Sequence, residues 1–355
     1  MRNDPKAATA SHPQRIVFLV PRYTFESVSF IAHQYVQALS ACGLDARIAS
    51  LRRSTLPADP LLNRSRWSLV SCNVLVTHLF LPDLVGCALS RLIPSIRWVP
   101  FLHCDIVGGL AAERRPLAKL KAWLWRAALS RAEMLISPSR YALHGARFTG
   151  TSIVVPHCIV PSVEAAFRRR AGSGGNEVGD AMPAAPPVET QSSYVFIGRD
   201  TRGKRLSTLL RMLGREPTAR LKVIGAIEHS RSVLERMEPS ALARCALLGR
   251  CYDPYRHVAV GEVVVCPSGR EGFGLVPLEC LARRIPVAVI NEGVFRELYG
   301  GTSIVYDRID ELPKIIGDLT RDTETLRRRF IGRDALAERI GQLMSVFDQL
   351  AHKRN

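Results

Sequence analysis

The stretch VVVCPSGREGFGLVPLE, residues 263–279, joins an apolar run to a segment that has a glutamate at each end and glycines inside it. The run at 263–266 is typical of a strand buried in a parallel sheet, and the leucines of 275–284 recur at helical spacing. The glycines let the backbone approach a ligand closely, and the new helix aims unpaired amides and its positive dipole end at the same place. The stretch therefore predicts a strand, an anion-binding loop and a helix.

The same alternation extends outward through both halves of the chain. RIVFLVPRY at 15–23 is followed by the helix-like FIAHQYVQALSACG, and SYVFIGRDTRGK at 193–204 is followed by LSTLLRMLG. Further apolar runs, such as NVLVTHLF, IRWVPFLH, RLKVIG and IPVAVI, are spaced as in alternating strands and helices. The pattern predicts an α/β fold with two doubly wound, Rossmann-like domains, whose ligands bind beyond the carboxyl ends of the strands.

The boundaries follow from composition. A stretch rich in Gly, Ala, Pro and Ser separates the two halves and lacks periodic apolar positions, which predicts a flexible linker over residues 171–193. We therefore expect an N-terminal domain at 1–170 and a C-terminal domain at 194–335. Apolar residues at helical spacing predict a terminal helix over 336–355, which is a candidate for packing back on the N-terminal domain.

Composition places the chain among ordinary globular proteins. It has 355 residues, of which 47% are hydrophobic and 23% charged, and is long enough for two domains. No apolar run reaches the roughly 18 residues that span a bilayer, and residues 1–15 lack the apolar core of a signal peptide, so we expect a cytoplasmic protein. Nine cysteines without a CxxC pair predict reduced core thiols, with no disulfide and no metal site.

The glutamate stretch also carries a family resemblance. Residues 267–289, PSGREGFGLVPLECLARRIPVAV, resemble the E-x7-E segment of the retaining GT-B glycosyltransferases, family 4 in the usual classification. The resemblance implies the GT-B fold, in which two Rossmann-like domains face each other across a cleft. It implies that Glu279 holds the ribose of a donor nucleotide and that Glu271 holds hydroxyls of the donor sugar. Gly272, Phe273 and Gly274 would contribute backbone amides to the same donor.

A second segment, FIGRDTRGKRLSTLLRML at 196–213, resembles the part of these enzymes that neutralises the donor diphosphate. Arg199 and Lys204 stand at the matching positions, where two cations stabilise the charge that grows on a departing diphosphate. Arg202 and Arg205 are expected to be surface charges. His103 follows a predicted strand where the family carries a histidine near the donor sugar. We therefore predict His103, Arg199, Lys204 and Glu271 as the catalytic residues.

Two segments of the first half resemble those that close the family's first domain. They are ISPSRYALHGAR and IVVPHCIVPSVEAAF, and in the second His157-Cys158 stands in place of the common Asn-Gly. Weaker indications are His78, a second histidine candidate for the cleft, and Asp105, a candidate for orienting His103 or binding the acceptor.

The first loop departs from the family. PRYTFESVSF at 21–30 has no glycine where relatives usually have Gly-Gly. Either side chains such as Thr24, Glu26 or Ser27 take over the contacts of that loop, or the loop lies further back. The mode of acceptor binding is therefore open.

The resemblance implies a retaining glycosyltransferase of the hexosyltransferase type with no tightly bound cofactor. The absence of an Asp-x-Asp motif near a strand end fits a metal-independent site. The donor would be a UDP-, GDP- or dTDP-sugar, and the acceptor an anionic glycan or a lipid-linked or lipopolysaccharide-type one. The family's usual mechanism is a same-face displacement in which the departing phosphate oxygen helps to deprotonate the acceptor. The alternative is a catalytically silent nucleotide-sugar-binding protein or a basic nucleic-acid-binding protein, although no nucleic-acid-binding module is recognisable.

Positive charge is concentrated in the first half. Residues 1–170 hold 22 Lys and Arg against 9 Asp and Glu, whereas the rest hold 27 against 23. The imbalance indicates either an anionic partner or a merely solvated arginine-rich surface. Within it, a helix predicted from Pro116 carries Trp123 and Trp125 among basic residues, which is typical of a helix on an anionic membrane surface or of one packed into the core. A peripheral position on the inner face of the cell membrane is thus an expectation.

Overall fold

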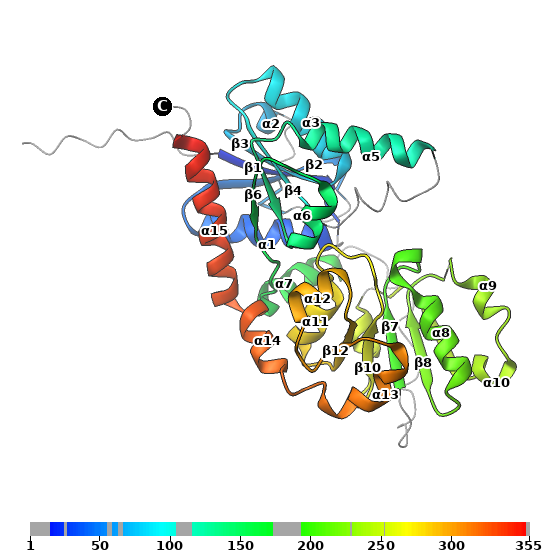
Figure 1. Ribbon diagram of the computed structural model, residues 1–355. Coiled ribbons are helices and arrows are strands. Elements are labelled where there is room, and N and C mark those ends of the chain that lie inside the picture. Colours follow the sequence, from blue (N-terminus) through cyan, green and yellow to red (C-terminus); the bar gives the residue numbers. More distant parts are fainter. Residues whose placement is uncertain are drawn as a thin grey trace, which may run out of the picture.

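The computed structural model describes residues 15–24, 27–54, 59–62, 67–103, 116–172, 193–227, 229–251 and 253–352. Two six-stranded sheets, one from each half of the chain, form two lobes, shown one above the other in Figure 1. We call them the first lobe, with strands β1 to β6, and the second lobe, with strands β7 to β12. The predicted α/β architecture of two doubly wound sheets is confirmed.

The first sheet is parallel throughout and has the strand order β2-β1-β3-β4-β5-β6. Its central strands are buried along their whole length, which explains their unbroken apolar sequences. In chain order the strands are β1 (Arg15–Arg22), β2 (Asp45–Arg52), β3 (Val74–His78), β4 (Arg97–Phe101), β5 (Met134–Ser137) and β6 (Thr151–Val154).

The second sheet is also parallel and has the order β12-β11-β10-β7-β8-β9. The order in which strands are added to the sheet reverses between β7 and β10, and doubly wound sheets bind their ligands at such a point. The strands are β7 (Ser193–Ile197), β8 (Arg220–Ile224), β9 (Cys245–Gly249), β10 (Val263–Cys266), β11 (Val287–Ile290) and β12 (Val305–Tyr306).

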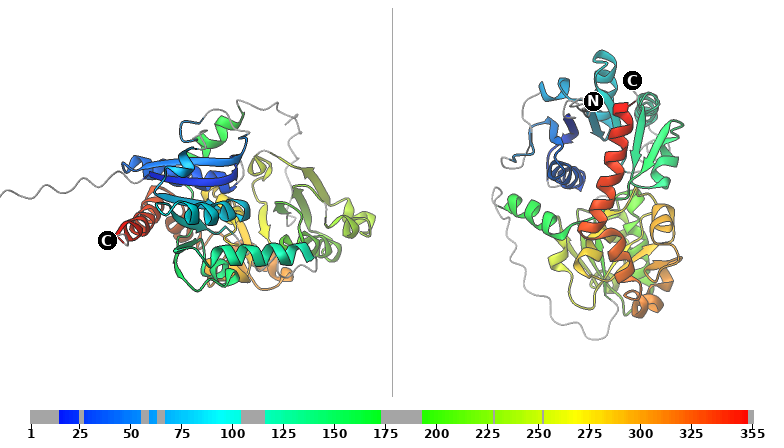
Figure 2. Two further views of the ribbon diagram at one scale, coloured as in Figure 1. Left: turned by 90° about the horizontal axis from the view of Figure 1, so that it is seen from above. Right: turned by 90° about the vertical axis from the view of Figure 1, so that its left-hand side faces the viewer.

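Helices cover the faces of both sheets (Figures 1 and 2). None of the helices in the described parts of the chain is long and apolar enough to cross a membrane. The first lobe has α1 (Ser27–Ala41), α2 (Trp67–Val70), α3 (Phe80–Leu92), α5 (Pro116–Leu129), α6 (Arg140–Ala146) and α7 (Pro161–Gly172). The second has α8 (Leu206–Arg215), α9 (Arg231–Leu234), α10 (Pro239–Leu242), α11 (Leu275–Arg283), α12 (Gly293–Tyr299), α13 (Leu312–Ile315) and α14 (Thr323–Phe330).

The final helix, α15 (Arg333–His352), begins three residues before the predicted start at 336 and lies against α1 of the first lobe. Figure 2 shows it, in red, running along the first lobe after α14 leaves the second. The predicted linker falls outside the described residues, except that α7 extends to Gly172 and β7 starts at Ser193. The domain boundaries at 170 and 335 stay predictions.

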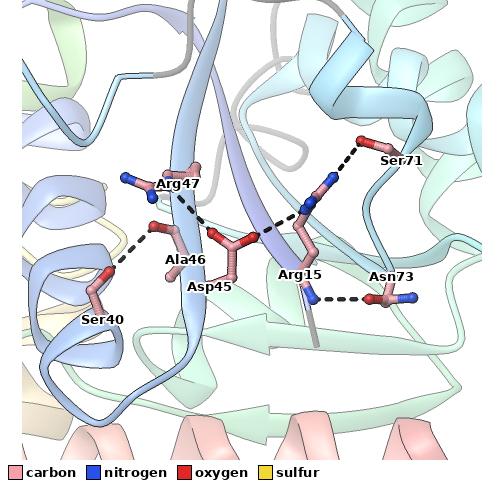
Figure 3. Close-up of polar contacts among 7 residues, drawn as sticks. All are labelled: Arg15, Ser40, Asp45, Ala46, Arg47, Ser71 and Asn73. Atoms are coloured by element: carbon pink, nitrogen blue, oxygen red, sulfur yellow. Dashed lines mark hydrogen bonds and ion pairs between the residues drawn. The ribbon is translucent and has the colours of Figure 1, made fainter. Parts of the chain in front are cut away.

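A polar network holds together the amino ends of the strands in the first lobe (Figure 3). The Arg15 guanidinium donates to the Asp45 carboxylate at 3.0 Å and to the Ser71 hydroxyl at 3.0 Å, so β1, β2 and the chain before β3 are tied together. The Arg15 amide donates to the Asn73 side chain at 2.9 Å. These contacts fix the amino ends of the strands. The candidate site lies at the opposite edge, where the carboxyl ends of the strands are.

Candidate active site

The loop between β10 and α11 brings the predicted residues Glu271 to Gly274 to the carboxyl edge of the second sheet. Gly274 is the residue before α11 and has a φ of 79°, in the left-handed region that favours glycine. A Cβ at this position would lie 2.3 Å from the ring of Phe295. The glycine thus lets the loop turn sharply into the helix while the chain lies against a core aromatic ring.

Lys204 and Glu271 form an ion pair across this edge. Lys204 ends a 3-10 turn (Arg202–Lys204) in the loop that follows β7, so the pair joins the loops at the point where the strand order reverses. The lysine side chain is 27% exposed and the glutamate 15%, so both reach solvent. Both residues line a small pocket together with Ser268, Gly274 and Pro277.

The backbone amides of Gly272, Phe273 and Gly274 donate to no described residue, whereas the Gly272 carbonyl accepts a hydrogen bond from the Ser139 hydroxyl at 2.6 Å. The Phe273 side chain is in the core, at 1% exposure. The three amides and the start of α11 are therefore positioned as donors to an anion or a sugar oxygen, while the side chain of Phe273 anchors the loop.

The other two predicted donor residues lie on the loop after β7 and on α11. Arg199 follows β7 and is exposed. Glu279 is on α11, where it accepts a hydrogen bond from the hydroxyl of buried Tyr255. Burial, and then the charge of Glu279, raises the pKa of Tyr255 well above its usual value, so the phenol stays a donor. Arg283 packs over the Tyr255 ring at 4.4 Å and closes this cluster.

His103 lies in a cluster of first-lobe rings that reaches the second lobe through His157. Its ring stacks on Phe101 at 5.2 Å and on His157 at 5.4 Å, and His157 meets Phe273 edge-on at 5.0 Å. His103 Nε2 is 2.5 Å from His78 Nδ1, so the weaker histidine candidate is its direct partner. The structure thus joins His103 to the glutamate loop through His157, while Asp105 lies outside the described residues.

The three imidazoles are neutral. Burial lowers the pKa of His103 to about 3, and it lowers the pKa values of His78 and His157 well below their ordinary value of 6.5. Nearby imidazoles add to the effect at His78 and His157 because like charges would repel. A neutral histidine has one N–H donor and one acceptor nitrogen, so His103 can hold a substrate oxygen by hydrogen bonding without bringing a charge to it.

Contacts between the lobes surround the site. Glu297 of α12 accepts hydrogen bonds from the backbone amides of Arg140 and Tyr141, at 2.8 and 2.7 Å, and so caps α6. Glu164 of α7 pairs with Arg283 of α11 at 2.7 Å. The segments around α6 and α7, which resemble those that close the family's first domain, therefore contact the glutamate loop and the helices near it.

Sequence reasoning missed several of these partners. Arg205, expected to be a surface charge, pairs with Glu292 at 2.7 Å and lies over Gly269, where a Cβ would come within 2.1 Å of its guanidinium. The Arg205 side chain is 39% exposed, and a basic loop gives no sign of its partner Glu292, the residue before α12. Tyr255 belongs to no motif, so only the fold places it on Glu279.

The first loop is only partly described. The Thr24 amide donates to the Ser29 hydroxyl at 3.1 Å, whereas Glu26 and the Ser27 side chain lie outside the described residues. Before them, the buried Tyr23 hydroxyl donates to Asp59 at 2.9 Å and lies 2.7 Å from His33 Nδ1. The start of the glycine-free loop is therefore anchored by side chains to α1 and to the chain at Asp59.

Among the described residues, no three His, Cys, Asp or Glu side chains are placed to hold a metal ion. The site instead offers a lysine, backbone amides and a helix start for negative charge, and a glutamate for hydroxyl groups. A phosphorylated sugar combines both kinds of group.

Comparison with known proteins gives this site a context. Residues 180–333 match the family model of glycosyl transferases group 1. A search of curated proteins found no match. The chain resembles the solved structure of a sucrose-phosphate synthase from Thermosynechococcus elongatus, with a TM-score of 0.68, 17% identity, and coverage of 95% of this chain and 100% of that one.

Two further structures support the same fold. A UDP-forming α,α-trehalose-phosphate synthase from Burkholderia vietnamiensis has a TM-score of 0.65 and 13% identity, over 97% of this chain and 99% of that one. WaaG, a glycosyltransferase involved in lipopolysaccharide biosynthesis, has a TM-score of 0.58 and 14% identity, over 88% and 94%. At such low identities the structural similarity shows the fold alone. The family match lies on the half of the chain that holds Lys204 and Glu271. The chain thus has the GT-B fold, and its residues 180–333 match the glycosyl transferases group 1, which supports a glycosyltransferase enzyme.

Proposed function

We propose that the protein transfers a sugar, with retention of anomeric configuration, from a nucleotide-sugar donor to an anionic glycan or a lipid-linked or lipopolysaccharide-type acceptor. The observation that carries this proposal is the Lys204–Glu271 pair beside the amides of 272–274, which donate to none of the residues that the structure describes. A lysine and a glutamate that neutralise each other in the free protein can each turn to a ligand that carries both phosphates and hydroxyls.

Each residue has a role in binding the donor. Lys204 and Arg199 hold the diphosphate, and Glu271 accepts hydrogen bonds from hydroxyls of the sugar. The amides of 272–274 bind phosphate or sugar oxygens, as the helix start favours. Glu279 holds the ribose, while Tyr255 donates to the same carboxylate and fixes its orientation.

The reaction is a same-face displacement. The bond between the anomeric carbon and the diphosphate oxygen breaks, and a bond from the acceptor oxygen to that carbon forms on the same face. The acceptor proton passes to the departing phosphate oxygen, so no enzyme base is consumed. Lys204 and Arg199 stabilise the charge that grows on the diphosphate, and they do so more strongly in the transition state than in the ground state.

His103 acts from the first lobe. Because it is neutral, it donates or accepts a hydrogen bond at the donor sugar and does not stabilise a phosphate by charge. We assign acceptor binding to the first lobe, because that part of the chain carries the excess of positive charge.

The nature of the acceptor is supported by charge and by similarity. Twenty-two basic against nine acidic residues in 1–170 favour an anionic acceptor or an anionic surface around it. WaaG, one of the similar structures, is named as involved in lipopolysaccharide biosynthesis. We extend this to a lipid-linked or lipopolysaccharide-type acceptor here, and to a peripheral position on the inner face of the cell membrane.

A thermal-shift screen with UDP-, GDP- and dTDP-sugars tests the donor site. Binding at about 100 times the Kd stabilises the protein by about 2.7 kcal/mol, which gives a clear rise in melting temperature. The rise is expected to disappear in Lys204→Ala and to shrink in Glu271→Ala. Arg202→Ala, a neighbouring exposed cation of the same loop, is the matched control and should respond as the natural protein does. Equal responses in all variants, or no response to any of these sugars, would show that the donor binds elsewhere.

A further inference from the structure

Helix α5 has two apolar faces, and the described part of the chain buries one of them. Ala118, Ala122, Trp125 and Leu129 are buried against the first lobe. On the other side Leu117, Leu120, Trp123 and Leu124 are exposed to 80%, 51%, 63% and 39%. A surface helix normally turns polar residues outward, so a run of large apolar side chains on the solvent face needs a partner.

Basic side chains border this exposed face. At 3.6 residues per turn, Lys119 and Arg126 fall on one border and Lys121 on the other, with Arg131 just beyond the helix. Helix α5 contains no acidic residue. A partner that fits must therefore be apolar in the middle and negatively charged on both sides.

The helix is held firmly in place beneath this face. The Trp125 indole donates to the Asp83 carboxyl of α3 at 2.7 Å, and the Trp125 ring meets Phe80 edge-on at 5.5 Å. The Lys121 ammonium lies 4.8 Å from the centre of the same Phe80 ring. Figures 1 and 2 show α5 at the outer edge of the first lobe, away from α15. The apolar face is thus a fixed surface that α3 supports from behind.

We propose that the exposed face of α5 docks on an anionic lipid bilayer. Trp123 and the three leucines enter the boundary between headgroups and acyl chains, while Lys119, Lys121 and Arg126 meet lipid phosphates. A second copy of the chain fits less well, because its own basic borders would face those of the first. The proposal deepens the peripheral location proposed above: it gives that location a surface, and it needs no assumption about the donor site.

Vesicle sedimentation tests this surface. The natural protein should sediment with vesicles that contain phosphatidylglycerol, much less with phosphatidylcholine alone, and less as salt rises, because the charges are screened. Soluble glycerol phosphate should not compete, since it offers charge without an apolar phase. Sedimentation that is indifferent to lipid charge would overturn the proposal.

Two variants separate the apolar face from its borders. The double substitution Leu120→Ser and Trp123→Ser is expected to weaken vesicle binding at least tenfold. The double substitution Lys119→Glu and Lys121→Glu is expected to weaken binding at least tenfold for anionic vesicles only. The control pair Leu247→Ser and Val260→Ser removes exposed apolar side chains from the second lobe and should bind as before. If the α5 variants bind vesicles normally, the face is not the docking surface.

Two further measurements separate membrane docking by α5 from donor binding and from self-association. The α5 variants should keep the donor-induced thermal shift, so a loss of vesicle binding with an intact shift supports docking by α5 independently of the donor site. Analytical ultracentrifugation of the natural protein should show no dimer that the α5 substitutions abolish. Such a dimer, without vesicle binding, would overturn the proposal and identify the face as a self-association surface.

Discussion

The hydrogen bond between His78 and His103 decides how His103 meets its substrate. His78 Nδ1 and His103 Nε2 are 2.5 Å apart, and His78 Nε2 is buried without a partner among the described residues. A buried N–H without an acceptor is rarer than an unpaired acceptor, so the proton of neutral His78 belongs on Nδ1. His78 then donates to His103 Nε2, and His103 carries its own proton on Nδ1. We infer that His103 is a hydrogen-bond donor to the substrate and that His78 is its positioning residue.

Substitution of His78 tests this tautomer. His78→Asn keeps a donor near the position of Nδ1 and should retain kcat/KM within a few fold, because one hydrogen bond of about 1.4 kcal/mol corresponds to tenfold. His78→Leu should lower kcat/KM roughly tenfold or more. Nitrogen NMR of His103 should show the Nδ1–H form in the natural protein and in His78→Asn. Equal activity of both variants, with an unchanged His103 spectrum, would assign His78 to packing alone.

Asp83 is expected to make stability depend on pH. It is fully buried and accepts hydrogen bonds from the Thr77 hydroxyl at 2.5 Å and the Trp125 indole at 2.7 Å. Burial raises its pKa to about 8, although the two hydrogen bonds oppose the rise. Between about pH 4 and pH 8 the folded protein therefore keeps a proton on Asp83 that the unfolded chain has released. The contribution of this proton to the free energy of unfolding is complete below about pH 4 and is lost as the pH rises through 8.

The buried histidines act in the opposite direction below pH 6.5, because there the unfolded chain binds protons that the folded protein does not. Between about pH 6.5 and 8 the Asp83 effect is alone among these groups, and the free energy of unfolding should fall by at most about 1.4 kcal/mol per pH unit. Denaturant unfolding across this range measures the slope. Asp83→Asn should flatten it, and the exposed Asp310→Asn should leave it unchanged. A flat profile in the natural protein would contradict a raised pKa at Asp83.

At the scale of elements, the sequence could predict those strands, loops and helices that depend on the local pattern of residues. The strand at 263–266, the loop with Gly274 and the helix from 275 follow from apolar runs and glycines, because these depend on neighbours in the chain. The pairing of Lys204 with Glu271 was within reach, since both follow strands whose carboxyl ends meet at one edge of the sheet.

Tertiary partners were beyond a single sequence. Nothing near Glu297 indicates that it caps α6 of the other lobe, and nothing near Arg205 indicates Glu292. Helix α5 shows the limit most clearly, because Trp123 and Trp125 look alike in the sequence while one is 63% exposed and the other 2%. Which tryptophan faces the lobe depends on α3, so a periodic pattern could not choose between core and membrane.

At the scale of the whole molecule, the segment between β6 and α7 is joined to the segment between α14 and α15. Ile159, after β6, forms an isolated parallel bridge with Ile331, between α14 and α15. Arg339 of α15, only 4% exposed, donates to the Pro156 carbonyl at 3.1 Å and to the Arg329 carbonyl at 3.3 Å. One guanidinium therefore connects the segment before α7 to the end of α14, next to His157 and its contact with Phe273.

Removal of the Arg339 guanidinium should lower both the stability of the protein and its activity. Arg339→Ala leaves two carbonyl groups in the junction without their donor and is expected to lower the free energy of unfolding by about 2–4 kcal/mol. It should also lower activity, because the Pro156 carbonyl precedes the histidine that joins His103 to the glutamate loop. Glu338→Ala removes only the 62% exposed partner of the same guanidinium, 2.5 Å away, and should change stability by less than about 1 kcal/mol. Chemical denaturation of both variants measures the difference. A loss below about 1 kcal/mol in both variants would mean that apolar packing around Ile159 and Ile331 holds the junction and that Arg339 contributes little.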